Sequence, residues 1–245
     1  MSSGSFTGKQ IFISGASGDI GRKTAEVFAK EGANLYLTGF KNADLLKEYA
    51  GDLSEKHGIL CRVFSGDLSD PDTVRNIFSE IKSLDLMINC AGAAYTCLLQ
   101  DMSDDDWKRV TGADLDSVFY CCRSAIPLFL KQGSGKIINI SSVWGNTGAA
   151  AEAAYSAAKG GVNALTKALA KELAPSGIAV NALAFGLIDT KMNSCYSKEE
   201  LEAVIEEIPA DRAGSVSEAA AAILHLAQMP EYLTGQVITM DGGWT

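Results

Sequence analysis

Histidine is nearly absent from this sequence of 245 residues, which contains only His57 and His225. Two histidines leave little material for a zinc site or a Ser-His-Asp triad, and no two cysteines have the CxxC spacing of a metal-binding or redox pair. We therefore predict no metal site and interpret the cysteines as buried structural thiols. They are Cys61, Cys90, Cys97, Cys121, Cys122 and Cys195.

Positive charge and long apolar runs are scarce as well. The net charge is -9 at pH 7, and without a basic stripe a nucleic-acid partner is not expected. No apolar run approaches the length needed to span a bilayer, so no membrane role is indicated. The lead-in from Met1 to Gly8 has neither a basic nor an apolar targeting region, and we expect a cytoplasmic location.

Short apolar runs alternate with amphipathic segments along the chain, which predicts a parallel α/β sheet. Helices are expected at Ile20–Glu31 and Ala43–His57, from about Asp70, after Asp104 and around Tyr155. With no linker or repeat, the pattern predicts a single-domain, doubly wound Rossmann fold over residues 1–245 with a seven-stranded parallel sheet. The expected strands are Gln10–Ser14, Asn34–Thr38, Ile59–Ser65, Leu84–Asn89, Lys136–Ile140, Ile178–Ala184 and Gln236–Met240.

The charged stretch from Asn193 to Pro209 follows the sixth expected strand. Ligands of open α/β sheets bind beyond the carboxyl ends of the strands. We therefore predict a mobile lid over the substrate, with a plain surface helix as the alternative.

Tyr155 and Lys159 are four residues apart in an expected helix, so they share one face about 6 Å apart. An ammonium group there stabilises a phenolate and brings the tyrosine pKa down towards working pH. Ser142 closes an apolar strand and faces the usual binding crevice. The three residues predict a proton donor, its activator and a carbonyl holder, although the Tyr-Lys spacing alone also fits an ordinary amphipathic helix.

A glycine-rich segment, Ser14 to Gly21, joins the first strand to the first helix. Small residues there let backbone N–H groups and a helix N-terminus approach a pyrophosphate. The placement in the first strand-turn-helix unit is that of a dinucleotide-binding loop. The cofactor contacts predicted here are Gly15, Ser17, Gly18, Asp19, Ile20 and Gly21.

With these motifs the chain resembles the short-chain dehydrogenase/reductase family over practically its whole length. It is most similar to the β-ketoacyl-(acyl-carrier-protein) reductase group, notably from Ile208 to Gly214. The other matching motifs are Asp67-Leu68, Asn89-Cys90-Ala91-Gly92, Asn139-Ile140-Ser141-Ser142, Asn181-Ala182 and the ending from Thr234 to Gly243.

The resemblance implies a ketoreductase in which Tyr155 is the general acid, Lys159 lowers its pKa and binds the ribose, and Ser142 donates to the substrate carbonyl. The expected substrate is a 3-oxoacyl thioester or a related small ketone. An acidic acyl carrier protein needs basic residues by the entrance, and the chain offers few. A symmetric homo-oligomer, usually a tetramer, is also implied. Further cofactor contacts implied by the family are Asp67, Leu68, Asn89, Ala91, Gly92, Gly186, Ile188 and Thr190.

Two aspartates depart from the family pattern. Asp19 replaces the middle glycine of the cofactor loop, where an inward carboxylate would repel a pyrophosphate; we expect it to point outward and cap the first helix. Asp114 replaces an asparagine of the proton relay, where we expect it to hold the relay water, raise the pKa of Lys159 and reduce activity. The alternative function is therefore a non-catalytic or weakly active nucleotide-binding member of the family.

Cofactor choice depends on the end of the second strand, Thr38 to Asn42. No acidic residue is present there to bind the ribose hydroxyls of NAD, while Gly39 leaves room for a 2′-phosphate and Lys41 is placed to pair with it. Gly18 and Phe40 stand where the family's NADP-binding arginines are expected. The sequence favours NADP(H), with NAD(H) as the alternative.

Overall fold

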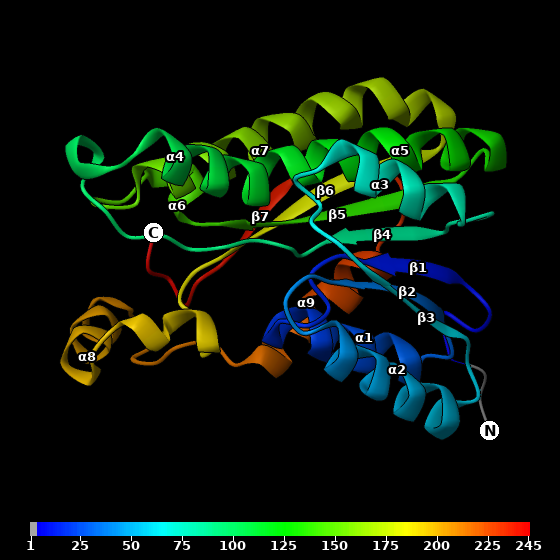
Figure 1. Cartoon of the computed structure of the whole chain (residues 1–245), viewed down its shortest axis with the longest axis horizontal. Helices are drawn as coiled ribbons and strands as arrows, with labels where there is room; N and C mark the ends of the chain where they lie inside the picture. Colours follow the sequence, from blue (N-terminus) through cyan, green and yellow to red (C-terminus); the bar gives the residue numbers. More distant parts are fainter. Residues whose placement is uncertain (1–3) are drawn as a thin grey trace.

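The computed structural model of the protein describes residues 4–245, except for the side chains of Ala43 and Cys195; the start of the lead-in, residues 1–3, lies outside it. At its centre is a parallel sheet in the order β3-β2-β1-β4-β5-β6-β7 (Figure 1). The predicted doubly wound Rossmann fold with seven parallel strands is confirmed. The strands are β1 (Gln10–Ile13), β2 (Asn34–Gly39), β3 (Cys61–Ser65), β4 (Leu86–Asn89), β5 (Gly135–Ser142), β6 (Ile178–Phe185) and β7 (Val237–Met240).

Helices cover both faces of this sheet (Figure 1). On one face lie α1 (Asp19–Lys30), α2 (Ala43–His57) and α9 (Val216–Gln228), and on the other α3 (Pro71–Ser79), α4 (Asp104–Thr111), α5 (Ser117–Gln132) and α7 (Ala153–Leu173). Ile13 belongs to the first apolar layer and its neighbour Phe12 to the second. Because both faces of the inner strands are buried, these strands are largely apolar, and each predicted strand lies within two residues of the observed one.

Polar capping residues set where several helices begin. Asp70 accepts hydrogen bonds from the backbone N–H groups of Asp72 and Thr73 before α3, whose first residue is Pro71. Ser197 and Ser215 form capping boxes with Glu200 and Glu218 at the starts of α8 (Lys198–Glu207) and α9.

The helix after Asp104 is interrupted by one irregular turn. A π-helical turn, η2 (Gly112–Asp116), joins α4 to α5 and accommodates an extra residue. It packs against α7 and places the side chain of Asp114 in the interior, with no exposed surface.

The predicted lid segment forms η4 (Lys191–Cys195) and α8. Helix α8 lies beyond the carboxyl ends of the strands, on the same side of the molecule as the C-terminus (Figure 1). The alternative of a surface helix therefore describes its structure, while its role as a lid stays a prediction. The remaining short elements are η1 (Leu99–Asp101), α6 (Trp144–Thr147) and η3 (Ala174–Ser176).

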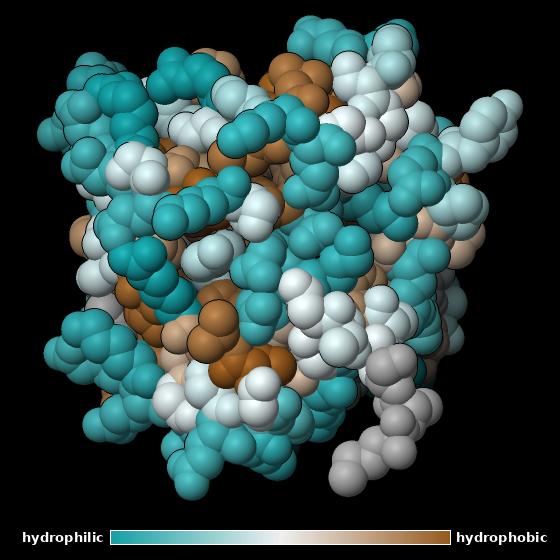
Figure 2. Space-filling model, turned by 90° about the vertical axis from the view of Figure 1, so that its right-hand side faces the viewer, coloured by the Kyte–Doolittle hydropathy of each residue, from teal (hydrophilic) through white to brown (hydrophobic). Residues whose placement is uncertain are grey.

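The opposite end of the molecule, at the amino ends of the strands, is covered mainly by hydrophilic residues (Figure 2). Hydrophobic residues show there as separate small spots. Within residues 4–245, no helix has the length and apolar character that a membrane crossing requires.

Candidate active site

The residues singled out from the sequence gather at the carboxyl edge of the sheet, because most of them directly follow its parallel strands. The glycine-rich loop follows β1, Lys41 follows β2 and Ser142 ends β5. The other positions are Asp67 and Leu68 after β3, Ala91 and Gly92 after β4, and Gly186, Ile188 and Thr190 after β6.

The glycine-rich loop is packed too closely for side chains at two of its positions. Gly15 has a left-handed φ of 64°, and a Cβ there would lie 2.7 Å from the Cα of Ala91. A Cβ on Gly21 would lie 2.4 Å from the carbonyl oxygen of Gly15. Ser14 accepts hydrogen bonds from the backbone N–H groups of Cys90 and Ala91, at 2.9 and 3.0 Å, and so ties β1 to the segment after β4.

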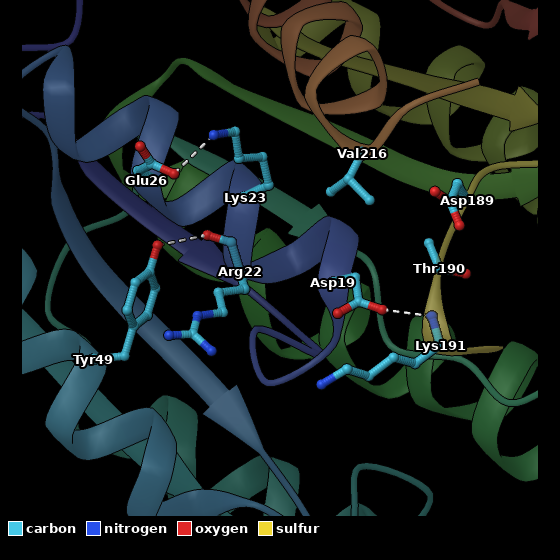
Figure 3. Close-up of a pocket in the computed structure, with 9 residues that line it drawn as sticks. All are labelled: Asp19, Arg22, Lys23, Glu26, Tyr49, Asp189, Thr190, Lys191 and Val216. Atoms are coloured by element: carbon cyan, nitrogen blue, oxygen red, sulfur yellow. Dashed lines mark hydrogen bonds and ion pairs between the residues drawn. The ribbon is translucent and has the colours of Figure 1, made fainter. Parts of the chain in front are cut away.

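Asp19 does not cap the first helix, so that prediction is wrong. Gly18 is the N-cap residue of α1 and Asp19 is its first helical residue, with no side-chain capping bond. Its carboxylate instead accepts a hydrogen bond of 2.7 Å from the backbone N–H of Lys191 (Figure 3). A negative charge in the first turn still suits the helix dipole. The carboxylate thus links the start of α1 to the segment after β6.

Lys159 is the most tightly held of the predicted catalytic residues. Its Nζ lies 3.1 Å from Oδ1 of Asp114 and donates a hydrogen bond of 3.1 Å to the carbonyl of Ile140. The two charged side chains are 5% and 0% exposed. The same Nζ lies 5.5 Å from the centre of the Tyr155 ring. Gly92 leaves room for this pair, because a Cβ there would come within 2.5 Å of Asp114 Oδ1.

The charges of this pair shift each other's pKa. Burial alone would lower the pKa of Lys159, but contact with Asp114 and Tyr155 outweighs it and raises the pKa above its ordinary value. The predicted influence of Asp114 on Lys159 is therefore confirmed. Burial raises the pKa of Asp114, against the opposing influence of Lys159. Asp114 Oδ2 also accepts a hydrogen bond from the backbone N–H of Ala93.

Tyr155 lies on the first turn of α7, half-buried beside Lys159. Burial raises the pKa of the phenol, and Lys159 and the Ser142 hydroxyl oppose this without reversing it. Lys159 thus lowers the pKa of Tyr155, as predicted, but burial raises it by more, so the net shift is upward. Tyr155 is consequently protonated at neutral pH, the state required of a proton donor. Asp114 contributes to the upward shift.

Asn89, at the end of β4, begins a chain of buried hydrogen bonds that reaches β5 and α7. It is 1% exposed and donates a hydrogen bond of 2.8 Å to Asn139, which in turn donates to Thr166 on α7. This buried polar chain aligns β4, β5 and α7 behind the site. Asp67 is exposed and accepts hydrogen bonds from Ser69, which fixes the turn after β3.

The end of β2 is closely packed at Gly39, where a Cβ would lie 2.9 Å from Cδ2 of Leu46 on α2, and the space for a 2′-phosphate stays a prediction. Phe40 and Lys41 are both exposed, and a Cβ on Gly39 would approach the Ser17 side chain at 3.3 Å. The glycine thus lets the second strand lie close to the glycine-rich loop.

A pocket of about 540 Å³ lies over the outer face of α1 (Figure 3). Arg22 crosses it with its guanidinium 4.2 Å from the centre of the Tyr49 ring. Among the predicted cofactor residues, Asp19 and Thr190 line this pocket. The other lining residues are Arg22, Lys23, Glu26, Tyr49, Asp189, Lys191 and Val216.

Two contacts near Tyr155 were not predicted from the sequence. Glu152, the N-cap residue of α7, accepts a hydrogen bond of 2.8 Å from the hydroxyl of Tyr196. The Tyr196 hydroxyl also lies 3.3 Å from Oγ1 of Thr96. Partners separated by 44 and 100 residues leave no local signal, although Glu152 at the start of an expected helix was visible in the sequence.

The cysteines agree with a structural role where they are described. Cys121 and Cys122 are buried, and Cys61, Cys90 and Cys97 are partly buried, all as free thiols. Burial raises the pKa of Cys90 and of Cys122 to about 12. Such thiols are protonated at neutral pH and poorly nucleophilic. The Cys195 side chain lies outside the described residues.

A doubly wound sheet with a glycine-rich first turn, and a Ser-Tyr-Lys group at its carboxyl edge, defines a Rossmann-type oxidoreductase. Residues 15–245 match the family model described as Enoyl-(Acyl carrier protein) reductase. The uncharacterized oxidoreductase YmfI of Bacillus subtilis is 36% identical over 96% of this chain and 98% of its own. The 3-oxoacyl-acyl-carrier-protein reductases FabG of Aquifex aeolicus and Thermotoga maritima are 35% and 36% identical, each over 96% of this chain and 97% of theirs. The chain belongs to the short-chain dehydrogenase/reductase family, as its motifs predicted.

Proposed function

We propose that this protein reduces a ketone to a secondary alcohol with NADP(H), and that Tyr155 is the general acid. The observation that carries the proposal is the arrangement of Lys159, which is buried, fixed by Ile140 and Asp114, and directed at the Tyr155 ring. An amphipathic surface helix has no need to bury a lysine beside a tyrosine, since a buried charge is costly unless paired.

The residues present fit a nicotinamide dinucleotide in the glycine-rich loop. Gly15 and Gly21 keep side chains away from the turn, and the start of α1 directs backbone N–H groups outward. Ser17, Gly18 and Ile20 complete the loop, while Lys41 and Gly39 at the end of β2 favour a 2′-phosphate over bare ribose hydroxyls. The carboxylate of Asp19 opposes an anion at this loop. When bound, such a cofactor supplies a hydride.

The side chains then divide the work on the substrate. Ser142 donates a hydrogen bond to the carbonyl oxygen, which holds the carbonyl beside Tyr155. As the carbonyl carbon is reduced, the C–O double bond opens and its oxygen takes the phenolic proton of Tyr155. Lys159 stabilises the phenolate that remains, because its ammonium lies beside the ring. Asp114 restrains Lys159 and competes with Tyr155 for its charge.

Two classes of substrate are candidates. The names of the FabG relatives support a 3-oxoacyl thioester, and a related small ketone uses the same carbonyl chemistry. For both substrate classes, the same experiment tests whether Tyr155 is the general acid. Loss of nicotinamide absorbance is followed with a panel of ketones for the wild type and Tyr155→Phe, which should lose about 100-fold or more in kcat. Tyr232→Phe, at a position 99% exposed, is the matched control and should keep full activity.

A second candidate function is nucleotide binding without efficient catalysis, and the ion pair between Asp114 and Lys159 favours it, because it draws the charge of Lys159 away from Tyr155. A fluorescence titration with NADPH and NADH separates the two candidates. Saturable binding together with turnover that depends on Tyr155 supports the reductase. If the cofactor binds but the protein has only a trace activity, and Tyr155→Phe leaves that activity unchanged, the result supports the alternative.

A further inference from the structure

Three loops meet beside Tyr155 at the carboxyl edge of the sheet. Residues 93–98 follow β4, residues 148–152 precede α7, and residues 191–197 follow β6. The backbone N–H of Cys97 donates a hydrogen bond of 2.7 Å to the carbonyl of Ala151. Thr96 and Glu152 both contact the hydroxyl of Tyr196, at 3.3 and 2.8 Å. Together these bonds join the three loops into a rim next to the start of α7, the helix that carries Tyr155.

Glu152 is held in place within this rim. The residue before it, Ala151, has a left-handed φ of 60°, which is unfavourable for a residue with a Cβ and is held by the bond from Cys97. Glu152 is the N-cap residue of α7, three residues before Tyr155, so both residues lie at the start of this helix. The negative charge of Glu152 adds to the raised pKa of Tyr155, after the larger contributions of burial and Asp114.

Among the residues that the structure describes, Glu152 is a carboxylate outside any ion pair. It is half-buried, burial raises its pKa, and the hydrogen bond from Tyr196 opposes that rise. In the described part of the chain, no lysine, arginine or histidine forms an ion pair with it. A half-buried carboxylate of this kind attracts a cationic or hydrogen-bond-donating group and repels an anion.

Acidic residues outnumber basic ones on the two helices next to these loops. Helix α8, which follows the third loop, carries five glutamates and the single basic residue Lys198, which lies 3.4 Å from Glu202. Helix α4 begins with three consecutive aspartates, Asp104 to Asp106, and ends with two basic residues, Lys108 and Arg109. Negative potential at an entrance slows the encounter with anionic ligands and favours neutral or cationic ones.

We propose that Glu152 determines substrate specificity: it accepts ketones that carry a hydroxyl or ammonium group near the carbonyl, and it excludes carboxylates and phosphate-bearing acyl thioesters. The inference rests on the proposed ketone reduction. Of the two candidate substrate classes, it selects the small ketones over the 3-oxoacyl thioesters. In this arrangement Ser142 and Tyr155 hold the carbonyl, while Glu152 accepts a hydrogen bond from the substrate's donor group in exchange for, or beside, that from Tyr196.

Three ketones of similar size and different charge test the proposal. They are acetoacetate, 4-hydroxybutan-2-one and protonated 4-(dimethylamino)butan-2-one, each assayed with NADPH for kcat/KM. The wild type should prefer the cation and the hydroxyketone over acetoacetate by about tenfold. Glu152→Gln should raise kcat/KM for acetoacetate and lower it for the cation, each by about tenfold, with the hydroxyketone changed by less than about threefold.

Matched variants separate charge from folding. Glu172→Gln changes an exposed glutamate at the far end of the same helix α7 and should leave all three ratios unchanged. Tyr196→Phe keeps the carboxylate but removes its hydrogen bond, so it should retain or steepen the preference for the cation. If Glu152→Gln folds poorly, the ratios measured for Tyr196→Phe decide: loss of charge discrimination in that variant overturns the proposal.

The remaining outcomes are also distinct. A wild-type preference for acetoacetate, or an equal effect of Glu152→Gln on all three ketones, overturns the specificity role and leaves ketone reduction standing. Failure to reduce any of the three ketones, or acetoacetyl coenzyme A, while NADPH binds, removes the proposed function and the specificity role with it.

Discussion

The carboxylate of Asp19 accepts a hydrogen bond of 2.7 Å from the backbone N–H of Lys191, across 172 residues of chain. The bond connects the first turn of α1, where a pyrophosphate is expected to bind, to the segment after β6. In that segment Ile188 and Thr190 are expected to contact the nicotinamide. A negative charge therefore occupies the junction of the two halves of the predicted cofactor site.

Replacing Asp19 with Asn should strengthen NADPH binding. The amide of asparagine keeps an acceptor for the Lys191 N–H but removes the negative charge. A negative charge beside a pyrophosphate at a partly exposed site costs about 1 kcal/mol of binding free energy, or about fivefold in Kd. Fluorescence titration measures the change. Asp52→Asn, at an exposed position on α2, is the control and should bind as the wild type does. Weaker binding by Asp19→Asn would mean that the carboxylate assists the loop.

Replacing Asp114 with Asn should raise kcat severalfold. The substitution frees the charge of Lys159 to act on Tyr155 and removes a carboxylate that raises the phenol pKa, so the loss of reductase activity at high pH should move to lower pH. The broken ion pair should lower the free energy of unfolding by about 2 kcal/mol or more, since a buried charge loses its partner. Asp116→Asn, exposed and two residues away, is the control. An unchanged or lower kcat contradicts the competition between Asp114 and Tyr155.

Gly21 and Gly18 should respond differently to alanine. A Cβ on Gly21 meets the carbonyl of Gly15 at 2.4 Å, whereas a Cβ on Gly18 meets it at 3.4 Å. Gly21→Ala should therefore lower the free energy of unfolding by about 1–3 kcal/mol and weaken NADPH binding, because the loop must shift. Gly18→Ala should be tolerated within about 0.5 kcal/mol. Chemical unfolding of both variants measures the difference, and equal losses would show that the loop adapts to either methyl group.

Glu218 should contribute to stability that acid removes. Its pKa is lowered to about 2 by hydrogen bonds from Arg212 and Ser215. Because the folded value lies below the unfolded one, the contribution is complete above about pH 4.5 and is lost as the pH falls through about 2. Glu218→Gln should lower Tm at neutral pH and flatten its decline in acid. Glu55→Gln, exposed on α2, should leave the profile unchanged; a wild-type slope in Glu218→Gln would count against the contribution.

The sequence predicted those features that depend on local pattern. Apolar runs located all seven strands, because helices cover both faces of the sheet, and the glycine-rich turn was recognisable from its place after β1. Lys159 was predicted beside Tyr155 from helical spacing alone.

Features that depend on tertiary contacts were missed or wrongly predicted. Asp19 was expected to cap α1, but its carboxylate accepts a hydrogen bond from the backbone N–H of Lys191 instead. The local sequence around Asp19 gave no sign of this distant donor. The direction of the Tyr155 pKa depended on burial, which outweighs the neighbouring ammonium. Glu152 and Tyr196 are joined only when three loops converge. No residue pattern distinguished the π-helical turn from ordinary helix.

That π-helical turn makes the chain length between α4 and α5 as important as its composition. Deleting one residue within Gly112–Asp116 would restore regular helix but rotate the preceding residues by about 100° relative to α5. Asp114 could then no longer face both Lys159 and Ala93, whichever residue type stood there. A single codon deletion would therefore uncouple the helix from the predicted proton donor, while each substitution in the turn changes one contact at a time.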